Sequence, residues 1–208
     1  MNLAPQSASL QLANPRKQKL MVEIEASLDE AGRWRKINAA YHADDIKFMR
    51  FLIPPGKRVL ELGCGTGELL AALEPSYGVG IDFGAETLAR AKAHFPHLHF
   101  VLGDAEDPAT LNAIEGPFDY IVIADTIGMF EDIDGTLRLI YQLCTPSTRI
   151  VISYYSHLWE PVLKSAEALG LRRKQPTVNY IATADFLNLM DLADFEVIDR
   201  EQRQLLPL

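Results

Sequence analysis

The chain has 208 residues, enough for one domain with a sizeable core, and its 48% hydrophobic and 23% charged content is that of an ordinary globular protein. Its net charge of −8 disfavours a nucleic-acid partner, which would need a basic surface. The sequence has no apolar segment long enough to span a bilayer and no signal-peptide pattern. Cys64 and Cys144 lack metal-ligand spacing, so we expect a reduced, cytoplasmic setting.

The N-terminal quarter is expected to hold a flexible arm followed by helices. Residues 1–15 are polar and interrupted by proline, as in poorly ordered termini. Apolar residues at helical spacing predict one helix over 17–28, and a longer second helix is expected over 29–52. The Pro-Pro-Gly segment at 54–56 ends that helix and turns the chain into the first strand.

The central stretch 58–82 predicts a strand, a glycine turn, a helix and a second strand that ends on an acid. The apolar run 59–62 is typical of a buried parallel strand, and strong helix formers fill 68–73. Asp82 follows the first turn glycine by 19 residues, close to the ~20 at which nucleotide-binding folds place a ribose-binding carboxylate. The glycines of the turn are Gly63, Gly65 and Gly67.

Helices and strands alternate through the rest of the chain. Further helices are expected over 85–95, 108–114, 133–143, 159–169 and 183–193. Further strands are expected over 99–104, 118–124, 149–154 and, as the start of a sixth strand, 195–198. This alternation predicts an α/β fold with a Rossmann-like, doubly wound and mostly parallel sheet.

The spacing of the turn glycines excludes two common nucleotide sites. A dinucleotide fingerprint requires G-x-G-x-x-G/A, and a Walker loop requires Gly-Lys-Ser/Thr; neither pattern is present. The turn has the form E-x-G-x-G-x-G, which resembles the first motif of class I S-adenosylmethionine-dependent methyltransferases. The resemblance covers residues about 58 to 155 in order and register. It implies the class I methyltransferase fold and S-adenosylmethionine as cofactor, with S-adenosylhomocysteine as product.

The resemblance implies that the first two strand ends hold the methionine and ribose parts of the cofactor. Glu61 and the backbone of Gly63 and Gly65 match the positions that hold the methionine moiety, and Cys64 lies in the same loop. Asp82 matches the acid that accepts hydrogen bonds from both ribose hydroxyls.

The following positions match the adenine and sulfonium parts of the same site. Phe83 is expected to pack on the adenine. Asp104 matches the acid that binds the adenine amino group, with the amide of Ala105 on a ring nitrogen. Ala124 and Asp125 lie where the fourth strand is expected to pass under the sulfonium.

The segment 34–42 resembles a helix that covers the cofactor in many small-molecule members, although an aromatic core stripe would show the same pattern. On that resemblance Tyr41 is expected to close over the methionyl and methyl groups. His42 and His157 are the candidate bases, because only histidine titrates near neutrality unperturbed. We expect no metal site, since the other three histidines lack the arrangement of a ligand set. These are His94, His97 and His99.

The implied reaction is methyl transfer to a small-molecule acceptor, and we expect the acceptor atom to be oxygen. No Asn-Pro-Pro-Tyr follows the fourth strand, which disfavours amino-group methylation of adenine or glutamine, and no Pro-Cys nucleophile is present. Two alternatives stay open at this point: another adenosyl-ligand enzyme on the same fold, or a non-catalytic cofactor-binding subunit.

We therefore expect one methyltransferase domain over 16–208, divided into lid helices, a cofactor-binding core and a C-terminal part of the sheet. The boundaries are 16–55, 56–155 and 156–208. The family's seventh, antiparallel strand is expected to be absent, which would leave an open sheet edge available for self-association and suggest a shortened version of a longer protein.

Overall fold

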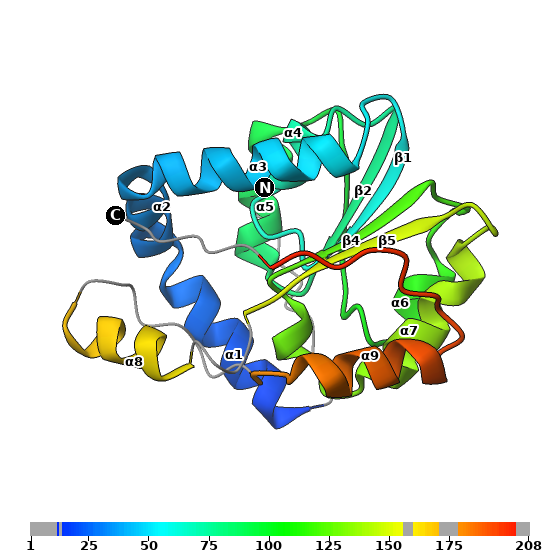
Figure 1. Ribbon diagram of the computed structural model, residues 1–208. Coiled ribbons are helices and arrows are strands. Elements are labelled where there is room, and N and C mark those ends of the chain that lie inside the picture. Colours follow the sequence, from blue (N-terminus) through cyan, green and yellow to red (C-terminus); the bar gives the residue numbers. More distant parts are fainter. Residues whose placement is uncertain (1–11, 13, 156–159, 171–178, 203–208) are drawn as a thin grey trace.

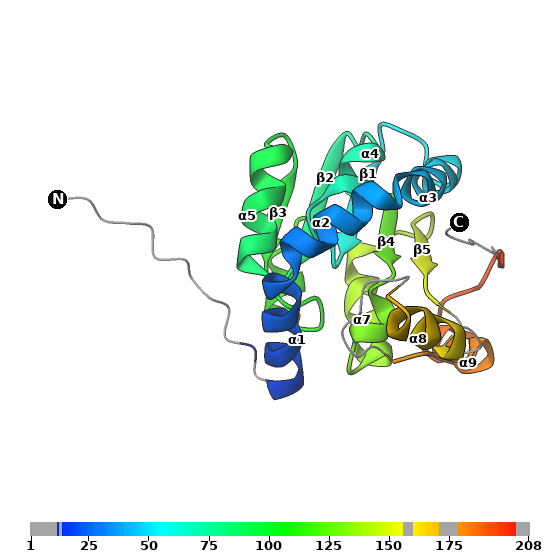
Figure 2. The ribbon, with the colours of Figure 1, turned by 90° about the vertical axis from the view of Figure 1, so that its left-hand side faces the viewer.

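A computed structural model describes residues 12, 14–155, 160–170 and 179–202. Its centre is a sheet of five parallel strands in the order β3-β2-β1-β4-β5 (Figures 1 and 2). The strands are β1 (Arg58–Leu62), β2 (Tyr77–Asp82), β3 (His99–Leu102), β4 (Tyr120–Ala124) and β5 (Arg149–Ser153). The first three strands step outward in one direction and β4 returns to the other side of β1. The strand order therefore reverses between β1 and β4, the kind of point at which open α/β sheets bind ligands.

Helices cover both faces of the sheet (Figure 1). On the side of α4, the helices are α3 (Ala39–Leu52), α4 (Glu68–Ala72) and α5 (Ala85–His94). On the other side they are α6 (Pro108–Asn112), α7 (Ile133–Ile140) and α9 (Thr183–Leu192). The remaining helices are α1 (Pro15–Ala26), α2 (Leu28–Ile37), α8 (Glu160–Ala168) and the 3-10 turns η1 (Ile127–Met129) and η2 (Tyr141–Leu143). None of the described helices has both the length and the apolar character needed to cross a membrane.

Neighbouring residues of the central strands enter two separate cores. Val59 and Val122 pack with residues of α3, α4 and α5, whereas Leu60, Ile121 and Ile123 pack with residues of α7 and α9. All five of these side chains are fully buried. A strand that is apolar on both faces needs helices on both sides of the sheet. The structure has helices on both sides, so the predicted doubly wound fold is confirmed.

The predicted single helix over 29–52 is wrong, because the chain forms two helices that point in different directions (Figure 2). The break is at Asn38, whose φ of −97° and ψ of 29° leave the helical region. Asparagine has a poor helix propensity because its side chain competes for local backbone groups. The turn matters for the site because it directs α3 back over the sheet while α2 keeps no buried residue.

The predicted sixth strand at 195–198 is also wrong. The N–H of Phe195 donates to the carbonyl oxygen of Met190 and finishes α9, and the described residues that follow, 196–202, form no ladder with β5. Val197 is 44% exposed and Ile198 is 62% exposed, so these apolar side chains have no sheet face to pack on. Among the described residues β5 pairs with β4 alone, and self-association through its outer edge stays a prediction.

Candidate cofactor and acceptor site

The lack of a side chain has different consequences at the three glycines of the turn after β1. A Cβ on Gly63 would lie 2.3 Å from Thr126 Cγ2, and a Cβ on Gly67 would lie 2.8 Å from Phe100. These two glycines therefore permit close packing within the fold. Gly65 has a φ of +53°, and a Cβ there would meet no atom within 4 Å. Of the three, only Gly65 leaves its backbone open to a ligand, and it does so beside the point where the strand order reverses.

Glu61 lies at the centre of the sheet, 3% exposed, directly before this turn. Its Oε2 atom is buried and has no hydrogen-bond partner. Burial raises the pKa of this carboxyl from 4.5 to about 8, against the opposing effect of a hydrogen bond from the backbone N–H of Leu70. A buried carboxylate without a partner is costly unless a cation supplies one. The ammonium group of S-adenosylmethionine fits that requirement.

Asp82 closes β2 and supports the same turn. Its Oδ2 accepts a hydrogen bond from the N–H of Gly65 at 3.0 Å, and its Oδ1 accepts one from the N–H of Gly84 at 2.8 Å. Burial raises the pKa of this carboxyl, while the N–H groups of Gly84 and Gly65 oppose the rise. A carboxylate has about four acceptor positions, so both oxygens keep capacity for the hydroxyls of a ribose. The predicted neighbour Phe83 follows directly and is half-buried.

The side chain of Cys64 does not face the ligand region. The residue is 6% exposed, and its sulfur fills the space over Gly80, where an added Cβ would come within 2.7 Å of it. Burial raises the pKa of the Cys64 thiol well above its usual range. Any contribution of Cys64 to a ligand is therefore limited to its backbone.

Asp104 follows β3 and forms an ion pair that the sequence analysis missed. Its Oδ2 lies 2.6 Å from Nζ of Lys17 in α1, and its Oδ1 accepts a hydrogen bond from the N–H of Glu106 at 3.0 Å. Lys17 also pairs with the carboxylate of Glu106, and its side chain is only 7% exposed. The periodicity of α1 shows no sign of this role, because a lysine on a helix is normally a surface residue. Ala105, between the two acids, is buried.

Asp125 follows β4 in a left-handed conformation, with a φ of 54°. Its N–H donates to the carbonyl oxygen of Ser153, and the Ser153 hydroxyl donates to its Oδ1 at 3.2 Å. Aspartate tolerates this conformation better than most residues, and such backbone geometry is frequent at functional sites. Ala124, the last residue of β4, is half-buried beside it.

Tyr41 reaches from α3 to the end of β5. Its hydroxyl lies 2.7 Å from the hydroxyl of Tyr155. Burial raises the pKa of Tyr41, and its neighbours Tyr155 and Asp125 raise it further, so the phenol stays protonated at neutral pH. This contact joins α3 to the segment that follows β5, and the lid role of Tyr41 stays a prediction.

His42 lies next to Tyr41 but faces a different group of charges. Burial lowers its pKa, the nearby Arg35 lowers it further, and Glu68 opposes both. Arg35 forms an ion pair with Glu68 at 3.4 Å, and Glu68 accepts a hydrogen bond from the hydroxyl of Thr66 in the glycine turn. His42 is thus a neutral imidazole at pH 7 near the predicted methionine end. The other candidate base, His157, lies outside the described residues.

A small cavity of about 30 Å³ lies at the carboxyl ends of β4 and β5. Its lining combines one carboxylate, one amide and three phenols: Asp125, Gly128, Tyr154, Tyr155, Asn179 and Tyr180. The sequence predicts an acceptor pocket between the helix that carries Tyr41 and the exits of the fourth and fifth strands, and this cavity lies at those exits; Asn179 and Tyr180 were not predicted to line it. At about 30 Å³ the cavity holds little more than a water molecule.

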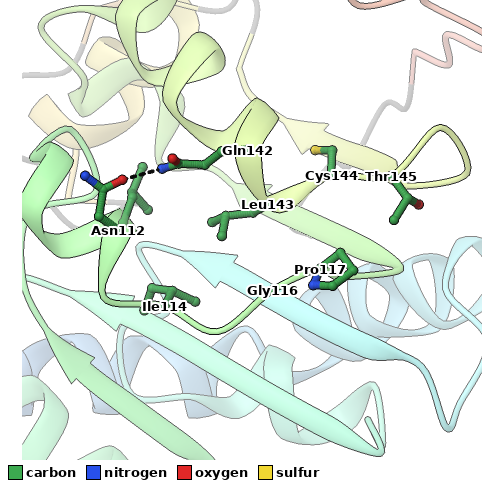
Figure 3. A pocket seen from close by; sticks show the side chains of 9 residues that line it. Asn112, Ile114, Gly116, Pro117, Gln142, Leu143, Cys144 and Thr145 are labelled. Atoms are coloured by element: carbon green, nitrogen blue, oxygen red, sulfur yellow. Dashed lines mark hydrogen bonds between the residues drawn. The ribbon is translucent and has the colours of Figure 1, made fainter.

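A larger cavity of about 470 Å³ lies near the amino ends of β4 and β5, away from the strand ends that carry the acids (Figure 3). Pro117 and Thr145, which precede β4 and β5, belong to its lining, and Asn112 and Gln142 hydrogen-bond across it at 2.8 Å. Its lining contains none of the predicted site residues and no charged side chain. We therefore assign the chemistry to the carboxyl ends of the strands. Within the described part of the chain, no group of three His, Cys, Asp or Glu residues is arranged to hold a metal ion.

Comparison with known proteins identifies the family. The model of the family described as "Methyltransferase domain" matches residues 33–200. The chain is 37% identical over 112 residues to the arsenite methyltransferase of Aquipseudomonas alcaligenes, a match that covers 47% of this chain and 32% of that protein. It is 33% identical over 113 residues to the 2-phytyl-1,4-naphtoquinone methyltransferase of Thermosynechococcus vestitus, covering 50% of this chain and 49% of that protein. The matches thus span about a third to a half of these relatives.

Solved structures share the fold at low sequence identity. An S-adenosylmethionine-dependent methyltransferase from Thermotoga maritima superposes with a TM-score of 0.69 at 20% identity, covering 86% of this chain and 82% of that chain. The magnesium protoporphyrin IX methyltransferase of Synechocystis, solved with bound S-adenosylhomocysteine, gives a TM-score of 0.62 at 18% identity, covering 86% and 90%. Since the family model covers well over half of its residues, the chain belongs to the class I S-adenosylmethionine-dependent methyltransferases.

Proposed function

We propose that this chain binds S-adenosylmethionine at the glycine turn and transfers its methyl group to the oxygen of a small molecule. The observation that carries the proposal is the buried, unpartnered Oε2 of Glu61 directly before an open Gly65. When bound, S-adenosylmethionine supplies an activated methyl group. Glu61 would pair with its ammonium, Asp82 with its ribose and Asp104 with its adenine amino group.

The acceptor would enter between α3 and the ends of β4 and β5. Tyr41 and Tyr155 supply hydroxyls there, and Asp125 supplies a carboxylate. Ordering the acceptor against these groups accounts for most of the expected catalysis, because positioning alone lowers a barrier substantially. His42, neutral at pH 7, is one candidate to take the proton of an acceptor hydroxyl, and His157 is the other.

The relatives differ in the acceptor that they methylate. Their names describe methylation of arsenite, of 2-phytyl-1,4-naphtoquinone and, on oxygen, of malonyl-[acyl-carrier protein]. The domain boundaries are likewise proposed: 16–55 as the lid, 56–155 as the cofactor-binding core and 156–208 as the C-terminal part.

Two measurements test the proposal in order. Calorimetric titration with S-adenosylhomocysteine tests cofactor binding, with Glu61→Ala as the variant expected to lose it. Release of S-adenosylhomocysteine is then scored against sets of hydroxyl, amine, thiol and arsenite acceptors. Turnover limited to amines or to arsenite would contradict the oxygen assignment while leaving the cofactor assignment intact.

A further inference from the structure

A buried ion pair joins α1 to the turn after β3, and two of its three members, Lys17 and Glu106, have no role in the proposed function. The Lys17 side chain is 7% exposed, that of Glu106 is 9% exposed and that of Asp104 is 19% exposed. One ammonium therefore lies between two carboxylates with little access to water. Removing a cation from such a site leaves like charges facing each other, which is strongly unfavourable.

The two carboxylates have different duties in the structure. Glu106 binds the backbone of the loop before α7: its Oε1 accepts hydrogen bonds from the N–H groups of Glu131 and Asp132 at 2.9 and 2.6 Å. Among the described contacts, the Asp104 carboxylate accepts only from the N–H of Glu106 and the ammonium of Lys17. Asp104 is also the more exposed carboxylate of the two, and it keeps acceptor positions for a ligand.

We propose that Lys17 is a positioning residue that makes the site select a purine with a 6-amino group, acting through Asp104. This rests on the proposed role of Asp104 at the adenine amino group. Lys17 balances the charge of Asp104 against that of Glu106 and fixes the orientation of the Asp104 carboxylate. The carboxylate then accepts a hydrogen bond from an amino group and opposes a 6-oxo group. Without Lys17, Asp104 is repelled by Glu106 and turns away, and the hydrogen-bond acceptor for the 6-amino group is lost.

The neighbouring residue Arg16 provides a matched control. Arg16 is also a long cation on α1, and its Nη1 lies 2.6 Å from Oε1 of Glu131. It ties the same helix to the loop after β4 without an ion pair to Asp104, and it is 40% exposed. An effect caused by loosening of α1 would appear in both variants, whereas an effect on Asp104 would appear only in the Lys17 variant.

The test compares calorimetric affinities for S-adenosylhomocysteine and its deaminated analogue, S-inosylhomocysteine. We expect the unmodified chain to prefer the amino compound by about tenfold or more, the worth of a hydrogen bond to a charged group. Lys17→Met should lower this preference about tenfold, Lys17→Arg should keep most of it, and Arg16→Met should leave it unchanged. If Lys17→Met does not fold, Lys17→Gln is measured in its place, with a reduced preference expected.

Three results would contradict the inference, and they are distinguishable. An equal loss of affinity for both compounds in the Lys17 variant would make Lys17 merely structural. Tight binding without any preference in the unmodified chain would remove Asp104 from the adenine site and Lys17 with it. Failure of the unmodified chain to bind S-adenosylhomocysteine at all would overturn the proposed function itself.

Discussion

Replacing Glu61 with glutamine should stabilise the ligand-free protein at alkaline pH while it weakens cofactor binding. The pKa of the carboxyl rises from 4.5 to about 8 on folding, and its Oε2 has no partner. A difference of about 3.5 pH units corresponds to roughly 5 kcal/mol. Ionisation of Glu61 lowers the folding stability by this amount as long as no cation is bound.

The sign follows from proton uptake on folding. Below pH 4.5 the carboxyl is protonated in both states, so it costs nothing. Between pH 4.5 and about 8 only the unfolded state is ionised, and stability falls as the pH rises. Above about pH 8 the full cost is present. The glutamine of the variant would keep an acceptor for the Leu70 N–H but would bury an unpartnered amide, at a cost of ~1–3 kcal/mol. The net gain at pH 9 is therefore roughly 2–4 kcal/mol.

Urea denaturation at pH 5 and pH 9 measures this difference, since the other titrating groups cancel between variant and parent. Glu30→Gln, at an exposed position of α2, is the matched control and should show no pH-dependent gain. The affinity of Glu61→Gln for S-adenosylmethionine should fall about ten- to hundredfold. If Glu61→Gln followed the parent's stability at both pH values, the carboxyl would not be buried and unpaired, and the reasoning would fail.

Four other outcomes are expected. Asp82→Ala should weaken S-adenosylhomocysteine binding by about 1.5–3 kcal/mol in calorimetry, and it should also lower the melting temperature because the N–H groups of Gly65 and Gly84 lose their acceptor. Gly65→Ala should lose more free energy of cofactor binding than free energy of folding, because the added methyl group lies where the ligand approaches. An affinity equal to that of the parent would contradict the open-turn assignment. Tyr41→Phe should lower kcat/KM about two- to tenfold with cofactor affinity unchanged, through loss of one hydrogen bond, and unaltered kinetics would remove the lid role. If His42 is the base, kcat/KM should rise with pH and level off at a lower pH than for an ordinary histidine, because burial lowers its pKa, and His42→Ala should lose ~10²–10⁴-fold in turnover; full activity would leave the proton to another group.

Local pattern in the sequence determined the alternation of helices and strands and the strand ends that carry acids. Apolar runs such as that of β1 can be placed only in a sheet covered on both faces, and a glycine turn before a helix has few alternatives. Glu61 and the turn glycines were predicted together because they are neighbours in the chain. Asp82 could be added because the length of one strand-helix-strand unit fixes its distance from the turn.

Only the tertiary structure decided which residues meet across the chain. Lys17 and Asp104 are separated by 87 positions, and Tyr41 and Tyr155 by 114. No periodicity within α1 marks Lys17, because its burial depends on the loop that α1 covers. The same reason explains the mistaken strand at 195–198, because whether an apolar run pairs as a strand depends on what neighbouring elements offer. The break at Asn38 is different, since it coincides with a residue of poor helix propensity.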